Sequence, residues 1–141
     1  MKSVAFSADG TRIVSGNANC SIKVWETETG KLLLTLRGHA GGVTSVAFNT
    51  NRDKIVSGSQ DKTIRIWNAE NGNEIWSTQP SSQMVIHVTF NKIGDRVISL
   101  DSQGAMTVQE ANTGQVLKNF VPDDVAHRGA YLQQSNIILG R

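Results

Sequence analysis

The sequence has little of several features that would point to a particular class of protein. Its one cysteine, Cys20, excludes an internal disulfide framework and fits a reducing compartment. No apolar run approaches the roughly 18 residues of a membrane span, and the N-terminus shows no signal-peptide pattern. The formal charge is +2 with both signs interspersed, so the chain lacks the basic patch that grips nucleic acid or anionic lipid. We therefore expect an intracellular protein, most simply cytoplasmic with the nucleus left open, that has no membrane association and for which nucleic-acid binding is disfavoured.

What the chain has instead is an internal repeat with a period of about 42 residues. The segment IVSGSQDKTIRIWN, which begins at Ile55, repeats IVSGNANCSIKVWE, which begins at Ile13. The same spacing relates Val4, Val46 and Val88; Phe6, Phe48 and Phe90; Ser15, Ser57 and Ser99; and Gly30, Gly72 and Gly114. A period of this length indicates a repeat architecture, in which each copy is one structural unit.

The copies are not equally intact. The third has Leu100 where the first two have glycine, and Gln109 where they have tryptophan. The segment Asn136–Gly140 echoes the start of a fourth copy. We expect repeat units at residues 1–37, 38–79 and 80–121, the third degenerate, followed by a truncated fourth unit at 122–141.

Within each copy, apolar residues alternate with period two over short runs separated by turn residues, which predicts strands. Pairs such as Asn71-Gly72 are hairpin signals, so neighbouring strands should be antiparallel. The strands expected in the second copy are Val43–Phe48, Lys54–Ser59, Thr63–Trp67 and Asn73–Ser77. A four-stranded antiparallel unit repeated with this period is typical of a propeller blade, so the predicted fold is all-β, a partial β-propeller.

The second copy resembles the WD-repeat β-propeller family. The motifs that carry the resemblance are Gly38-His39, Val46-Ala47-Phe48, Ser57-Gly58, Asp61, and Ile64, Ile66 and Trp67. The Trp-Asp pair that names the family is incomplete, since Trp25 precedes Glu26 and Trp67 precedes Asn68. The third copy departs further, with Pro80-Ser81 in place of Gly-His and Gln103 in place of Asp61.

His39, Ser57 and Asp61 are the residue types of a hydrolase triad, which also requires an exposed nucleophile and an oxyanion hole. The family resemblance implies a different role. It implies a buried chain of hydrogen bonds that runs from the Trp67 indole through Ser57 and His39 to Asp61, and such a chain stabilises a blade when every polar group is satisfied. We favour this structural role and expect no catalytic residue.

Other chemistry finds little support in the sequence. His39, His87, His127 and Cys20 lack ligand-like spacing, so we expect no metal site and no cofactor. Trp76 stands where the first copy has Leu34; we expect it to pack, with a partner anchor as the alternative.

Without a reaction, function should lie in surfaces, and the leading hypothesis is a non-catalytic scaffold for protein or peptide partners. The family resemblance implies a contact surface formed by the loop into the first strand and the turn after the second. At matching positions this predicts binding by Ala18, Gly42, Thr44, Gln60, Met84, Ile86 and Ser102.

An alternative is that the chain is the recognition or sensor part of a larger multidomain signalling protein or enzyme. The predicted blades do not close a ring, and an open propeller would expose sheet faces and edges. We therefore expect further WD-repeat blades, in the same or another chain, as a second kind of partner.

Overall fold

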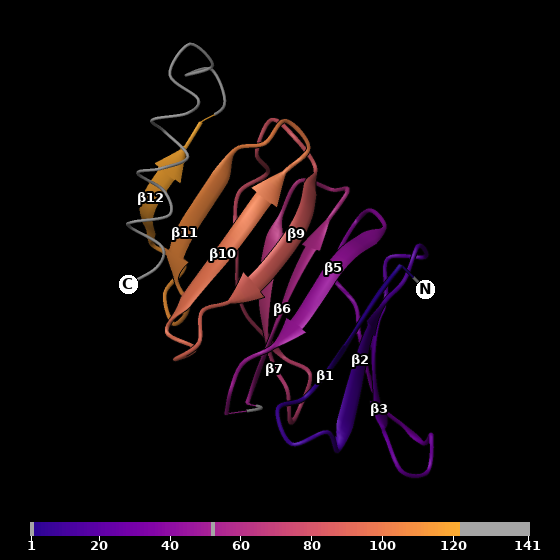
Figure 1. Ribbon diagram of the computed structural model, residues 1–141. Helices are drawn as coiled ribbons and strands as arrows, with labels where there is room; N and C mark the ends of the chain where they lie inside the picture. Colours follow the sequence, from indigo (N-terminus) through magenta and orange to yellow (C-terminus); the bar gives the residue numbers. More distant parts are fainter. Residues whose placement is uncertain (1, 52, 122–141) are drawn as a thin grey trace.

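The computed structural model describes residues 2–51 and 53–121, and these form three four-stranded antiparallel sheets (Figure 1). Blade 1 contains β1 (Ser3–Phe6), β2 (Arg12–Gly16), β3 (Ile22–Glu26) and β4 (Leu32–Leu36). Blade 2 contains β5 (Val43–Phe48), β6 (Lys54–Ser59), β7 (Ile64–Asn68) and β8 (Glu74–Ser77). Blade 3 contains β9 (Val85–Phe90), β10 (Arg96–Asp101), β11 (Met106–Glu110) and β12 (Val116–Phe120).

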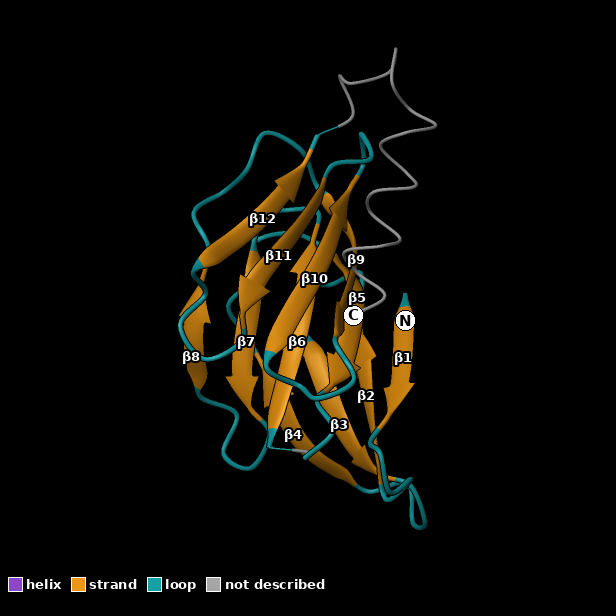
Figure 2. Ribbon diagram, turned by 60° about the vertical axis from the view of Figure 1, so that its left-hand side comes forward, coloured by secondary structure: helices purple, strands orange, loops and turns teal. Residues whose placement is uncertain are grey.

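The prediction of an all-β fold built from four-stranded antiparallel blades is confirmed. Figure 2 shows only strands and loops among the described residues. In blade 2 the first two strands have the predicted bounds, whereas β7 and β8 begin one residue later than predicted and β7 ends one residue later. The described residues contain no helical segment with the length and hydrophobicity of a membrane span. The expected fourth unit at 122–141 lies outside the described residues.

The hairpin turns follow from local chemistry. In the turn between β7 and β8, Gly72 has a φ of +79° and its N–H donates to the Asn68 carbonyl at 2.9 Å. A side chain at this φ would strain the backbone, which explains why glycine recurs here in every copy. The Asn68 side chain accepts hydrogen bonds from the next backbone N–H groups and holds the turn.

The blades stack face to face in chain order, with β5 lying between β1 and β9 (Figure 1). Along β5, Val46 and Phe48 face blade 1, while the small residues Ser45 and Ala47 face blade 3. Ser45 joins the inner strands directly, because its hydroxyl accepts a hydrogen bond from the Val88 N–H at 3.0 Å. Small residues on β5 thus allow the backbones of β5 and β9 to approach each other closely.

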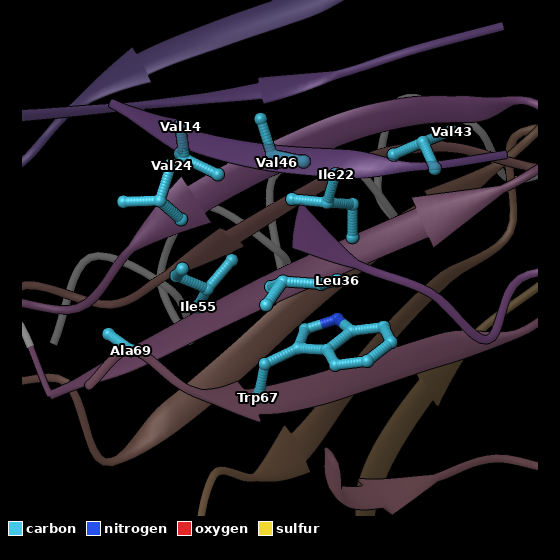
Figure 3. Packing of buried hydrophobic residues seen from close by; sticks show 9 residues of the cluster. All are labelled: Val14, Ile22, Val24, Leu36, Val43, Val46, Ile55, Trp67 and Ala69. Atoms are coloured by element: carbon cyan, nitrogen blue, oxygen red, sulfur yellow. The ribbon is translucent and has the colours of Figure 1, made fainter. Parts of the chain in front are cut away.

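Two apolar layers hold the stack together. In the layer between blades 1 and 2, the Trp67 indole lies at one edge of the cluster, with Leu36 and Ile55 on the side toward the other members (Figure 3). The buried members of this layer are Val14, Ile22, Val24, Leu36, Val43, Val46, Ile55, Trp67 and Ala69. The layer between blades 2 and 3 is formed by Val56, Ile64, Ile66, Val85, Val88, Val97 and Ala111. Full burial of each large side chain contributes about 1.5–3 kcal/mol, so the face-to-face contact is the main stabilising interaction of the fold.

A repeated glycine makes this contact possible. A Cβ added at Gly58 would lie 2.5 Å from Cγ1 of Val85, and one added at Gly16 would lie 2.6 Å from Cγ1 of Val43. Any larger residue would push the next blade away. Leu100 holds the same position in blade 3, where no described sheet packs against that face.

Trp76 packs between blades. Its indole N–H donates to the Ala111 carbonyl at 2.8 Å, and its ring lies 3.0 Å from where a Cβ would stand on Gly114. The structure therefore supports the packing role over an anchor for an outside partner.

Candidate interaction surface

The buried network of blade 2 is a continuous chain of hydrogen bonds. The Trp67 indole N–H donates to the Ser57 hydroxyl at 2.8 Å, and the hydroxyl lies 2.7 Å from Nε2 of His39. Nδ1 of His39 lies 2.8 Å from the Asp61 carboxylate. Every hydrogen bond in the chain has one donor and one acceptor when Ser57 donates to Nε2 and the Nδ1–H group donates to Asp61.

The loop before β5 and the turn after β6 hold this chain in place. The Asp61 carboxylate accepts from the Ala40 N–H and the Thr63 N–H, each at 2.9 Å, and from the Thr63 hydroxyl at 2.6 Å. Thr63 was missed from the sequence. The signal was available, because Ser21 lies at the matching position one repeat earlier and bonds to Asn19 in the same way.

Burial and hydrogen bonding set the charges of the pair. Burial lowers the pKa of His39 below 6.5 and outweighs the hydrogen bond to Asp61, which raises it. Burial raises the pKa of Asp61, but hydrogen bonds from Thr63, Ala40 and His39 outweigh it and bring the pKa to about 2. At neutral pH the pair is a neutral imidazole beside a carboxylate.

This geometry can satisfy buried polar groups but cannot present a nucleophile. Ser57 is fully buried, and its hydroxyl oxygen already accepts from Trp67 while contacting His39. Nucleophilic attack needs an accessible hydroxyl beside space for a substrate carbonyl. No group of three potential metal ligands occurs within residues 2–51 and 53–121.

The other two blades carry partial versions of the network. In blade 1 the Trp25 indole N–H donates to the Ser15 hydroxyl at 3.1 Å. In blade 3 the residue at the tryptophan position, Gln109, turns its amide to the Gly114 carbonyl at 2.9 Å. Ser99 retains its place, but its hydroxyl has no hydrogen-bond partner within the described part of the chain.

The turns after the second strands of the blades share one conformation. Cys20 and Lys62 have φ values of +76° and +74°, and Gly104 at the next repeat position has +90°. Repeated turn geometry brings these turns, with the loops that enter the first strands, to one face of the stack.

The seven predicted binding residues lie together on this face. A Cβ on Gly42 would stand 3.1 Å from Oε1 of Gln60 and 3.4 Å from the Ala18 carbonyl. The Thr44 hydroxyl donates to the Val85 carbonyl at 2.5 Å, between Met84 and Ile86 in sequence. The Ser102 N–H donates to the Met84 carbonyl at 3.0 Å. These contacts link the predicted residues from blade 1 to blade 3.

Their exposure differs. Gly42 is buried, and Thr44 is half-buried with its hydroxyl bonded to backbone carbonyls, so both lie beneath the surface. Ala18, Gln60, Met84, Ile86 and Ser102 are exposed. Gln83 belongs to the same surface, because its side-chain oxygen accepts from the Ser102 hydroxyl at 3.1 Å. Nothing in the sequence pattern singled Gln83 out.

Four-stranded antiparallel blades that stack face to face define a repeat protein of the propeller class. In blade 2, a buried polar network lies beneath the loops of the face described above. The family model described as "WD domain, G-beta repeat" matches residues 1–26 and 30–68. Residues 1–26 and 30–68, which form most of blades 1 and 2, are therefore WD40 repeats.

Individual relatives match over about one repeat. The nuclear distribution protein nudF of Aspergillus terreus is 45% identical over 42 residues, which are 30% of this chain and 9% of that protein. The uncharacterized WD repeat-containing protein alr2800 of Nostoc sp. is 44% identical over 41 residues, or 29% of this chain and 3% of the relative. The F-box/WD repeat-containing protein 7 of Drosophila melanogaster is 56% identical over 36 residues, or 26% and 3%. The matched segment therefore spans less than a tenth of each of these relatives.

Proposed function

We propose that this protein is a non-catalytic scaffold that binds a protein or peptide partner on the loop face described above. The contact surface of the proposal comprises the exposed residues Ala18, Gln60, Met84, Ile86 and Ser102, supported from below by Gly42 and Thr44. The observation that carries it is the pair of apolar side chains at this face, Met84 and Ile86, which are 38% and 41% exposed. Buried apolar anchors surrounded by polar residues are the usual energetic centre of a protein interface.

The family supports the proposal in general terms, since WD40-repeat domains generally serve as protein-interaction scaffolds. The rigid blades supply a surface whose loops vary without disturbing the core. The proposed setting is intracellular, because WD40 proteins commonly work there. Nucleic acid is a poor fit, because the five exposed residues carry no positive charge.

Paired substitutions test the surface. Peptides selected from a displayed library on the unmodified chain should lose about 10-fold or more in affinity when Ile86 and Met84 are both changed to aspartate, because the apolar anchors are gone. Binding is measured by fluorescence anisotropy, and circular dichroism checks that the strands are retained.

The control is Ile93→Asp, which changes another exposed isoleucine, 76% accessible, in the turn between β9 and β10. Peptide binding that persists in the Met84→Asp/Ile86→Asp variant would show that another surface binds the partner.

A second candidate is that these blades form the recognition part of a larger multidomain protein. The observation that favours it is the small share of each relative that is matched, together with one relative whose name places an F-box beside WD repeats. In that case further blades would pack on the open faces of blades 1 and 3. An antibody raised against the chain would then detect an endogenous protein well above 15.3 kDa. A band at that mass alone would contradict this candidate.

A further inference from the structure

A cavity of about 210 Å³ lies between blades 2 and 3. Its wall includes Ile64 and Thr78 of blade 2, and Ser99, Gln109 and Val116 of blade 3. None of the five exposed residues of the proposed contact surface lines it, although Val85 and Asp101, which are next to three of them in sequence, do.

The repeat explains why the cavity exists. In blade 2 the corresponding space, facing blade 1, is filled by the Trp67 indole and the His39 imidazole, whose ring centres are 6.2 Å apart. The matching positions one repeat later carry Gln109 and Ser81, and both line the cavity. A glutamine thus replaces the indole and a serine replaces the imidazole, and both side chains are smaller than the rings. The backbones of blades 2 and 3 do not move together to fill the space that is left.

Of the groups that hydrogen-bond to those rings in blade 2, the serine is retained in blade 3 as Ser99. Ser99 occupies the position of Ser57 and is 6% exposed, yet its hydroxyl bonds to no group in the described part of the chain. Gln109 is 2% exposed and uses its Nε2 group on the Gly114 carbonyl, while no donor within residues 2–51 and 53–121 reaches its Oε1 atom. Neither oxygen is fully buried, so water or a ligand that enters the cavity can supply the missing partner.

The remaining wall sets the character of a ligand. Ile64, Val85 and Val116 supply apolar surface. The two charged lining residues, Lys62 and Asp101, have opposite signs, so the wall carries no net formal charge. For scale, an apolar cavity of about 150 Å³ in a protein core admits benzene, so this cavity has room for a bicyclic ring.

We propose that this cavity is a binding site for a small, neutral, planar heterocycle that donates a hydrogen bond from a ring N–H to the Ser99 hydroxyl. The ring packs against Ile64 and Val116 and occupies the space that the indole of Trp67 fills in blade 2. Gln109 offers Oε1 as a second acceptor. This proposal is independent of the protein-recognition surface proposed above.

Indole is the probe, and benzothiophene, which has the same shape without the N–H group, is its matched control. In ¹⁵N-labelled residues 1–141, indole should cause saturable shifts of the Ser99 backbone amide and the Gln109 side-chain amide. Benzothiophene should bind about 5-fold or more weakly, since it cannot donate the hydrogen bond. Ser99→Ala should weaken indole binding by a similar factor.

Gln109→Trp fills the cavity from within and should abolish indole binding. Gln115→Trp adds the same side chain at an exposed position of the same blade and should leave binding unchanged. The proposal is overturned if indole produces no saturable shift up to its solubility limit. It is also overturned if Ser99→Ala binds indole and benzothiophene as the unmodified chain does, because the N–H donor would then have no role.

Discussion

His39 combines two opposing influences in one side chain. Burial removes water that would solvate an imidazolium, whereas the Asp61 carboxylate 2.8 Å away favours it. Burial prevails, so the folded protein holds a neutral ring that accepts from Ser57 and donates to Asp61. The histidine is thus a relay between a hydroxyl and a carboxylate, and its protonation would remove the acceptor that Ser57 needs.

Stability should therefore depend on pH. The pKa of His39 is lower in the folded chain than the 6.5 of the unfolded one, so between the two values the unfolded chain binds more protons. The free energy of unfolding should be highest above pH 6.5 and fall on acidification, with a slope that stays below the one-proton limit of about 1.4 kcal/mol per pH unit. Urea unfolding from pH 7.5 to 5.5 measures it.

His39→Gln serves as the control, because glutamine can hydrogen-bond but does not titrate. Its unfolding free energy should vary less across the same range. An equal slope in both proteins would mean that His39 is not the titrating group. A further loss between pH 3.8 and about 2 is expected as Asp61 protonates, since its pKa is lowered by folding.

Blades 2 and 3 place the same serine in different surroundings. Ser57 joins the Trp67 indole to His39, whereas Ser99 stands beside a cavity with its hydroxyl unpaired among the described residues. The strands around them are alike, with β6 and β10 each paired antiparallel on both sides. The difference in stability between the blades should therefore come from side chains that meet across strands.

Ser57→Ala should lower the free energy of unfolding by about 1–3 kcal/mol, since it leaves the Trp67 and His39 ring nitrogens without their buried partner. Ser99→Ala removes the same hydroxyl and should change it by less than about 0.5 kcal/mol. Thermal and urea unfolding of both variants provide the comparison. Equal losses would indicate that Ser99 has a partner equivalent to those of Ser57.

Within residues 2–51 and 53–121, the outer sheet faces of blades 1 and 3 pack against no other sheet. On blade 1, Ser3 accepts a hydrogen bond from the Val46 N–H and so faces blade 2, while Val4 and Phe6 face away and are 55% and 61% exposed. Their counterparts Val46 and Phe48 pack into the layer between blades 1 and 2. An apolar face of this kind favours association with another sheet.

Residues 1–141 alone should therefore self-associate, and Phe6→Lys should shift the population toward the 15.3 kDa monomer. Light scattering after gel filtration gives the mass. Ile93→Lys, which charges a turn residue that is 76% exposed, should leave the association unchanged. A monomer at all accessible concentrations in the unmodified chain would contradict the prediction.

The sequence alone determined the repeat, the strand order and the turns. These depend on interactions between residues close in the chain, such as the alternation of Val46 and Ala47 or a glycine at a positive φ. The hydrogen bonds of His39 were expected from the family resemblance, whereas Thr63 was missed although Ser21 places a hydroxyl at the matching position of the first copy.

Only the tertiary structure decided what depends on contact between blades. It showed that Gly58 makes room for Val85, that Trp76 bonds to Ala111, and that Thr44 lies beneath the surface. It also showed the cavity beside Ser99. A sequence pattern tells which residues are missing from a repeat, but whether neighbouring blades close over the space depends on packing among residues far apart in the chain.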